Sequence, residues 1–190
     1  MHRPTLVTAP ASGPVSLIES KAHLRVDSSD DDALIGALVL AAVSHLDGYT
    51  GLLGRCMITQ VWVQKFDDWQ TILRLPFADV QGVVLRYVDE SDVEQTVSAT
   101  LYTLFQDGLG HYIRFEDEFT DPSAGPDYGG ISATMTCGFG AADDVPAALK
   151  AAMLLHIGTL YEYRETLSER VAPNMAFDAL IAPYRRVGIG

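Results

Sequence analysis

The chain has 190 residues, of which 48% are hydrophobic and 20% charged, and its formal net charge is −12. This composition is typical of a folded globular protein and excludes the charge-rich signature of disorder. No stretch reaches the ~18 to 20 consecutive apolar residues of a membrane span, and the N-terminus lacks the apolar core of a signal peptide. No cluster of Lys and Arg is present that could displace counterions from phosphates, so we expect neither membrane insertion nor tight DNA binding.

Two helices are predicted in the N-terminal part of the chain. Ser16 and Glu19 have the spacing of a capping box, which predicts a short helix that ends near Arg25. A second helix should follow the acidic segment 27–32, because acids stabilise the positive end of the helix dipole. Its expected apolar stripe is Leu34, Leu38, Ala42, Leu46 and Tyr49, and Gly51 is the expected stop.

The middle of the chain is predicted to form strands. Six segments are rich in β-branched and aromatic residues: 56–66, 71–75, 80–89, 94–105, 111–116 and 131–139. Turn sequences such as "DESD", "QDGLG" and "DPSAGPDYGG" separate them, and no helical period intervenes. Antiparallel pairing through hairpins is therefore the expected arrangement.

Helical periodicity returns at Pro146, which suits a first helical turn. A long helix is predicted to reach about Thr166, and a last short helix should begin after Asn174 and break at Pro183. We therefore predict an α+β fold: a small helical bundle formed by N- and C-terminal helices with an inserted antiparallel β-unit. The expected boundaries are 1–54 and 143–190 for the bundle and 55–142 for the β insert.

No metal site is predicted. His23 and His45 lie on different predicted helices without a second ligand at a spacing of three or four, and His111 is alone in a strand. His156 lies within an apolar helix and is expected to be a core histidine. The two cysteines, Cys56 and Cys137, belong to no Cys-x-x-Cys spacing, so we expect both to be reduced and buried.

Motifs of catalysis and of cofactor binding are also missing. The sequence has no Gly-x-Ser-x-Gly elbow and no phosphate-binding loop, and "CGFGAAD" lacks the third glycine of a dinucleotide fingerprint. We predict no catalytic residue, no metal and no cofactor. The alternatives that remain are a small-ligand-binding or catalytic domain with a site between helices and acidic strands, and a stand-alone binding module.

The segment 145–166 changes character along its length. Its first half is apolar nearly all round, which requires burial on several sides, and its second half carries large amphipathic side chains of the kind that interfaces favour. This helix could be the central helix of a monomer or a helix of a self-associating protein. The candidate interface residues are Leu160, Tyr161, Tyr163, Arg164 and Glu165, followed by Arg170, Tyr184, Arg185 and Arg186 near the C-terminus.

The negative charge is concentrated between Asp89 and Asp144, which contain twelve acids and the single base Arg114. Such a segment can repel DNA, bind a basic partner, or simply keep the protein soluble. The leading acids are Asp89, Glu90, Asp92, Glu116, Asp117 and Glu118.

The order of these pieces resembles a known family. The matching blocks are "VSLIESKAHLRVDSSDDDALI", "AAVSHLDGYTGLLGRCMITQVWVQKFDDW", "LRLPFADVQGVVLRYVDESD" and "FGAADDVPAALKAAMLLHIGTLYEYRET", with "LIAPYRR" at the end. The chain resembles the head-tail connector (adaptor) proteins of tailed phages and gene transfer agents, namely the phiE125 gp8 family and gp6-like connectors. Where such proteins often have Asn-Arg-Glu, Arg164 and Glu165 carry the match and Tyr163 departs from it.

The resemblance implies a structural virion protein without catalytic activity. Family members form a ring, usually of twelve copies, beneath the portal protein, and the ring receives stopper or tail-terminator proteins while DNA passes through without tight binding. The implied location is the neck of a virion or phage-like particle assembled in the bacterial cytoplasm. The resemblance also implies that residues 171–190 contact the portal, although a helix that closes the bundle would account for the same pattern. For the acidic segment it implies a lining of the DNA channel, with a docking surface for tail proteins as the alternative.

Overall fold

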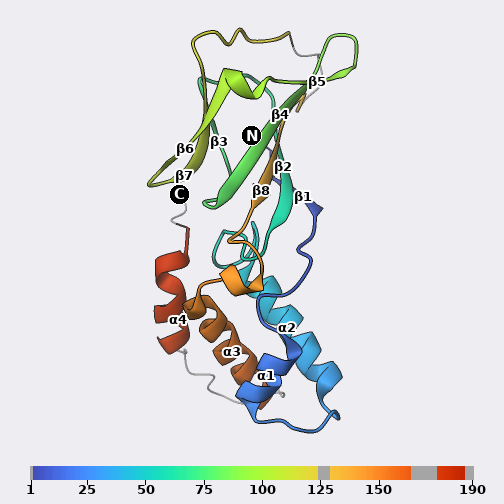
Figure 1. Ribbon diagram of the computed structural model, residues 1–190, viewed down its shortest axis with the longest axis vertical. Coiled ribbons are helices and arrows are strands. Elements are labelled where there is room, and N and C mark those ends of the chain that lie inside the picture. Colours follow the sequence, from blue (N-terminus) through green and yellow to red (C-terminus); the bar gives the residue numbers. More distant parts are fainter. Residues whose placement is uncertain (1, 124–128, 164–174, 187–190) are drawn as a thin grey trace. The chain divides into compact units, whose positions relative to one another are not determined.

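The computed structural model describes residues 2–123, 129–163 and 175–186, and it confirms the predicted α+β class (Figure 1). The chain divides into two compact units. One, here called the β-unit, comprises residues 1–10, 59–138 and 186–190, and the other, the helical unit, comprises residues 11–58 and 139–185. Among the described residues, no helix has both the length and the hydropathy to cross a membrane.

The first helix of the helical unit, α1 (Leu17–Leu24), begins as its sequence predicts. The Ser16 hydroxyl accepts a hydrogen bond from the Glu19 amide at 3.2 Å, and the Glu19 carboxylate accepts one from the Ser16 amide at 2.7 Å. This reciprocal pairing satisfies two amides that the first turn leaves without helical partners. The helix ends at Arg25, which has a positive φ of 57°.

Helix α2 (Asp32–Leu46) ends earlier than predicted. Its fully buried stripe is Ile35, Val39, Ala42 and Leu46, whereas Leu34 and Leu38 are only half-buried. Ala42 and Leu46 are buried as predicted, but Ile35 and Val39 take the buried positions expected for Leu34 and Leu38. The reason is that apolar residues occur on two adjacent faces of this helix. The chain leaves the helix at Asp47, not Gly51, because the Asp47 carboxylate accepts a hydrogen bond from the Met57 amide at 2.6 Å and holds the following loop.

The C-terminal half supplies α3 (Ala147–Glu162) and α4 (Met175–Ile181), and short 3-10 turns lie at Ala142–Asp144 and Ala182–Tyr184. Helix α3 starts directly after Pro146, as predicted, and Pro183 lies in the turn that ends α4. The predicted end of α3 near Thr166 is wrong, because α3 ends at Glu162 and Tyr163 has left the helical conformation. Asn174, the predicted cap of the last helix, lies outside the described residues. The core of the helical unit includes Val39, Leu46, Leu149, Met153, Ile157 and Ile181.

The β-unit contains two antiparallel sheets. Their strands are β1 (Thr5–Thr8), β2 (Gln60–Phe66), β3 (Ile72–Arg74), β4 (Val80–Val88), β5 (Glu94–Thr96), β6 (Tyr102–Asp107), β7 (Gly110–Phe115) and β8 (Ile131–Cys137). The five-stranded sheet has the order β1-β2-β8-β4-β5, and the three-stranded sheet has the order β3-β7-β6. Each of the six predicted segments overlaps at least one of these strands.

Strand β1 is a correction to the sequence analysis, which placed residues 1–54 in the bundle. Residues Thr5–Thr8 instead pair with β2, so the first ten residues belong to the β-unit. The run "TLVT" between Pro4 and Pro10 has strand propensity, but nothing in the sequence identifies its partner.

The core of the β-unit is formed by apolar side chains from both sheets. Among them are Leu73, Leu85, Ile113, Ile131 and Met135, all with 0% exposure. Both cysteines are buried thiols, as predicted. Cys56 belongs to the helical unit and Cys137 ends β8 in the β-unit.

Candidate interaction surfaces

The end of α3 carries three of the candidate interface residues. The Tyr161 hydroxyl donates a hydrogen bond to the carboxylate of Asp31, the residue that precedes α2, and Leu160 is half-buried. Tyr161 therefore has a role inside the helical unit, where it ties α3 to the start of α2. Tyr163, which follows α3, is 45% exposed and is available to a partner. Arg164, Glu165 and Arg170 lie outside the described residues.

An open pocket of about 410 Å³ lies between the last turn of α1 and the second half of α3. It is lined by His23, Leu24, Leu155, Gly158, Thr159, Tyr161 and Glu162. A Cβ at Gly158 would lie 3.5 Å from His23 Nε2, which is an ordinary contact, so the glycine is not required by close packing there. The described residues contain no group of three or more His, Cys, Asp or Glu side chains that could hold a metal ion.

His156 lies in a ring cluster of the helical unit. Its imidazole stacks on His45 with ring centroids 4.9 Å apart and lies 5.4 Å from the Phe177 ring. Burial lowers the pKa of His156, and the neighbouring His45 lowers it further. The expected core role is therefore refined to an aromatic stack that joins α2, α3 and α4.

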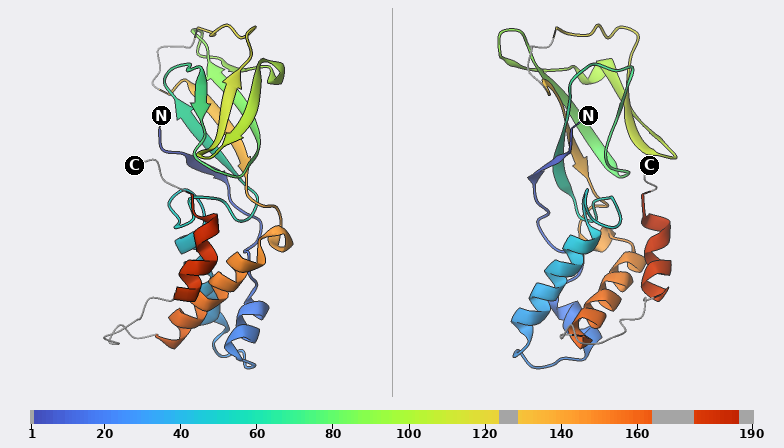
Figure 2. Two further views of the ribbon diagram at one scale, coloured as in Figure 1. Left: turned by 90° about the vertical axis from the view of Figure 1, so that its left-hand side faces the viewer. Right: turned by 180° about the vertical axis from the view of Figure 1, so that it is seen from behind.

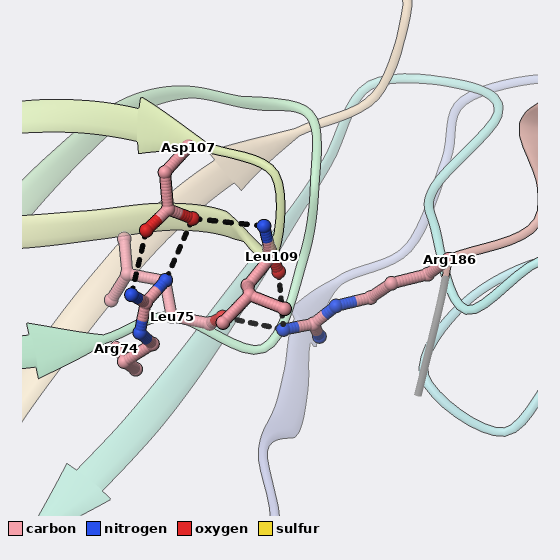
Figure 3. A network of polar contacts seen from close by, with 5 residues as sticks. All are labelled: Arg74, Leu75, Asp107, Leu109 and Arg186. Carbon is pink, nitrogen blue, oxygen red and sulfur yellow. Dashed lines mark hydrogen bonds and ion pairs between the residues drawn. The ribbon is translucent and has the colours of Figure 1, made fainter. Parts of the chain in front are cut away.

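The C-terminal residues Tyr184, Arg185 and Arg186 have three different environments. Tyr184 meets the Phe139 ring edge-on at a centroid distance of 6.5 Å, and Arg185 is exposed. The half-buried Arg186 belongs to the β-unit, where its guanidinium donates to the carbonyl oxygens of Leu75 at 3.2 Å and Leu109 at 3.4 Å (Figure 3). It also donates to the carbonyl of Pro76.

Beside this contact, Arg74 and Asp107 form a bidentate ion pair across the three-stranded sheet, with nitrogen-oxygen distances of 2.8 and 2.6 Å (Figure 3). Asp107 also accepts a hydrogen bond from the Leu109 amide at 2.9 Å. The Arg74 hydrogen bonds, followed by that amide, lower the pKa of Asp107 to about 2. We call Arg74, Asp107 and Arg186 with their backbone partners the turn clasp, because together they hold the β6–β7 turn and the chain after β3.

The turn clasp was not predicted from the sequence. Neither Arg74 nor Asp107 lies in a motif, and 33 positions separate them along the chain. Only the pairing of β3 and β6 with opposite sides of β7 brings them together.

The six candidate acids fall into two groups. Asp89 accepts hydrogen bonds from the amides of Ser91 and Val93, at 2.9 and 3.1 Å, and from the Gln95 side chain at 2.8 Å. The Gln95 hydrogen bond, followed by that from Val93, lowers the pKa of Asp89, so this acid holds the β4–β5 turn.

Two further acids also have partners within the β-unit. Glu116 accepts a hydrogen bond from the Thr103 hydroxyl at 2.6 Å, and Glu90 accepts one from the Ser123 hydroxyl at 2.6 Å. Glu90 and Glu116 are nevertheless exposed, as are the other acids Asp92, Asp117 and Glu118, and Asp92 has a positive φ of 61° at its turn. The exposed group can face a channel, a partner or solvent.

No protein-family model matches the sequence, and no curated protein matches it. Solved structures do. A chain in the neck of an empty gene transfer agent particle, computed with C6 symmetry, is 25% identical with a TM-score of 0.80. The alignment covers 100% of this chain and 98% of that chain.

A chain in the virion of a native gene transfer agent particle is 25% identical with a TM-score of 0.79 and the same coverage. A chain in the native neck computed with C12 symmetry is 23% identical with a TM-score of 0.71, which shows the fold alone. The chain is therefore similar along its whole length to a structural protein of a gene transfer agent neck. These likenesses support the predicted class of neck protein and its predicted location in a virion or phage-like particle.

Proposed function

We propose that this chain is a head-tail connector (adaptor) of a phage-like particle. In this role it binds beneath the portal, links the DNA-filled head to stopper or tail-terminator proteins, and lets DNA pass. The observation that supports the role is the full-length likeness to a neck chain at 25% identity. The alternative of a ligand-binding or catalytic domain has no comparable support, and we propose no catalytic role.

The proposed assembly is a ring of identical copies, with twelve as the expected number. Two of the similar neck structures were computed with C6 and C12 symmetry, and both symmetries are compatible with a twelve-membered ring. Closed rings of this kind use a head-to-tail contact, in which two different patches of the chain meet.

The proposed contacts use the exposed candidates Tyr163 and Arg185. They lie at two separate places of the helical unit, because Leu160 and Tyr163 are at the C-terminal end of α3, whereas Tyr184 packs on Phe139, which precedes the start of that helix. Tyr161 and Arg186 already bind groups inside their own units, so their substitution would disturb folding as well as docking. Arg164, Glu165 and Arg170 remain proposed contacts outside the described residues.

The exposed acids Asp117 and Glu118 are proposed to line the DNA channel. Carboxylates repel phosphates at short range, and salt at ~0.15 M screens the repulsion beyond about 8 Å, so DNA can slide without being held. Replacement of both acids by Lys should slow DNA ejection, more strongly at low salt. The matched control is Asp27→Lys, which reverses an exposed acid in the helical unit.

The experiment that tests the role is removal of this chain from a particle-producing host, followed by electron microscopy of the particles. The connector role requires DNA-filled heads without tails, and normal particles when the chain is supplied again. Tailed, infectious or transducing particles made without the chain would overturn the proposal. If Asp117→Lys/Glu118→Lys particles eject DNA normally but lack tails, the acids face a partner and the channel assignment is wrong.

A further inference from the structure

The two edges of the five-stranded sheet differ in a way that suits a contact between copies. Strand β1 forms one edge, and the described residues pair it with β2 alone. Strand β5 forms the other edge and pairs with β4. Both edges belong to the β-unit, so their separation is set within one compact unit. Unpaired strand edges offer backbone amides and carbonyls to another chain.

Strand β1 is short and lies between Pro4 and Pro10, but it lacks the charged side chains that commonly prevent edge pairing. All four of its residues are exposed, including Leu6 at 42% and Val7 at 59%, and Figure 2 shows the strand, in dark blue, running along β2. Edge strands usually carry charged side chains, and β1 has none.

Charge distinguishes the β5 edge from the β1 edge. Residues 89–96, which form the β4–β5 turn and β5, contain four acids and no base. Residues 1–18 contain Arg3 and no acid, although the whole chain has a net charge of −12. A contact between two β5 edges would bring two acidic segments together, which is unfavourable, whereas the β1 edge has no acid. Val93, 50% exposed, adds an apolar group at the β5 edge.

We propose that the β1 edge of one copy docks on the β5 edge of the next copy, so that the sheets of neighbouring copies join through β-strand addition. The contact is head-to-tail, because two different edges meet, and such a contact is what a closed ring requires. This inference rests on the proposed ring, but it names the contacting surface. The edge backbone supplies the attraction, and the charge difference opposes pairing of two identical β5 edges.

Cysteine cross-linking in assembled particles tests the proposal. The variant Val7→Cys/Glu94→Cys is oxidised and analysed on a denaturing gel without reducing agent. Three strands separate β1 from β5, so four steps of about 4.8 Å place the two edges at least roughly 19 Å apart within one copy. A disulfide needs Cα atoms within about 7 Å, so any bond between the new cysteines joins different copies. The two native cysteines are buried and do not interfere.

The proposal requires a ladder of bands beyond the dimer from Val7→Cys/Glu94→Cys or from Val7→Cys/Thr96→Cys, which moves the cysteine two residues along β5. The control Val7→Cys/Asp117→Cys moves it to an exposed acid outside the β4–β5 turn, and the ladder should be lost. Dimers from Val7→Cys alone would show that two β1 edges meet and would overturn the proposal.

The same experiment separates failure of the edge contact from failure of the connector role. Particles that contain the variants but give no ladder contradict the edge contact and leave the connector role intact. If purified particles contain none of the unsubstituted chain, the connector role itself is wrong. If only the Glu94 variants fail to enter particles, the Thr96 pair decides the question, because Thr96 carries no charge to lose.

Discussion

The β-unit and the helical unit have similar net charges but differ in architecture, because one is built from paired strands and their turns and the other from packed helices. The β-unit contains 6 bases and 13 acids, a net charge of −7, and the helical unit contains 7 bases and 12 acids, a net charge of −5. In the helical unit, apolar residues on facing helices form a continuous buried cluster. Charged side chains bind backbone groups of turns in the β-unit, as Asp89 and Arg186 do, and Asp47 binds the Met57 amide in a loop of the helical unit.

This difference predicts different responses to substitution. Helical packing depends on buried volume, so the helical unit should be most sensitive to loss of apolar atoms. A turn held by a charged side chain loses a specific backbone partner when that side chain is removed, and a backbone group left without a partner is costly. Four sets of variants test whether the two units respond in these ways.

The largest effect is expected for Leu46→Ala in α2. Leu46 is 0% exposed, and removal of its side chain from the core should lower the free energy of unfolding by about 2–5 kcal/mol. The matched control is Leu40→Ala in the same helix, because Leu40 is 71% exposed and should change stability by less than about 0.5 kcal/mol. Urea unfolding followed by circular dichroism measures both, and equal losses would contradict the assigned core.

The next effect concerns the turn clasp. Arg186→Ala removes donors to the carbonyls of Leu75 and Leu109 and should destabilise the β-unit by about 1–3 kcal/mol. Amide hydrogen exchange should become faster in the β6–β7 turn and in the chain after β3. The neighbouring Arg185→Ala is the control, because Arg185 is exposed. If both variants exchange as the unsubstituted protein does, Arg186 does not hold these turns.

A smaller, pH-dependent effect is expected for His156. Its folded-state pKa is lowered, chiefly by burial, so the unfolded chain takes up a proton at a higher pH than the folded chain does. The contribution of neutral His156 to the free energy of unfolding should therefore be fully present above about pH 6.5 and decrease as the pH falls below that value. In His156→Gln, the free energy of unfolding should change less with pH between about pH 7 and pH 5 than it does in the unsubstituted protein.

The variant His45→Gln provides the second arm of this test. It removes the neighbouring imidazole charge, so the pKa of His156 should rise toward its usual range in an NMR titration. An unchanged pH slope in His156→Gln would show that this stack does not couple protonation to stability.

The smallest effect is expected for the Arg74–Asp107 ion pair, because both groups are exposed enough for solvent to screen them. The folded-state pKa of Asp107 is lowered to about 2, so its contribution is present above about pH 4 and is lost as the pH falls toward 2. As the pH falls from about 4 toward 2, the free energy of unfolding of Asp107→Asn should decrease less than that of the unsubstituted protein. In Arg74→Gln the pKa of Asp107 should rise, which carboxyl NMR can measure, and an unchanged value would contradict the pairing.

Local sequence determined the parts of the fold that depend on neighbouring residues. The capping box at Ser16 and Glu19 fixed the start of α1, because both hydrogen bonds form within one turn. The start of α3 after Pro146 and the approximate positions of the central strands were predicted for the same reason. Exposed candidates such as Tyr163 could also be named from the sequence, since large amphipathic groups favour interfaces.

Only the tertiary structure decided which distant segments pair. Strand β8 enters the five-stranded sheet between β2 and β4, and β1 joins the edge of that sheet from the start of the chain. These pairings place Asp107 opposite Arg74 and leave β1 and β5 as two unlike edges. The pattern of a strand specifies which of its faces is buried, but the partner is selected by the packing of the complete sheet, and that selection involves residues far apart along the chain.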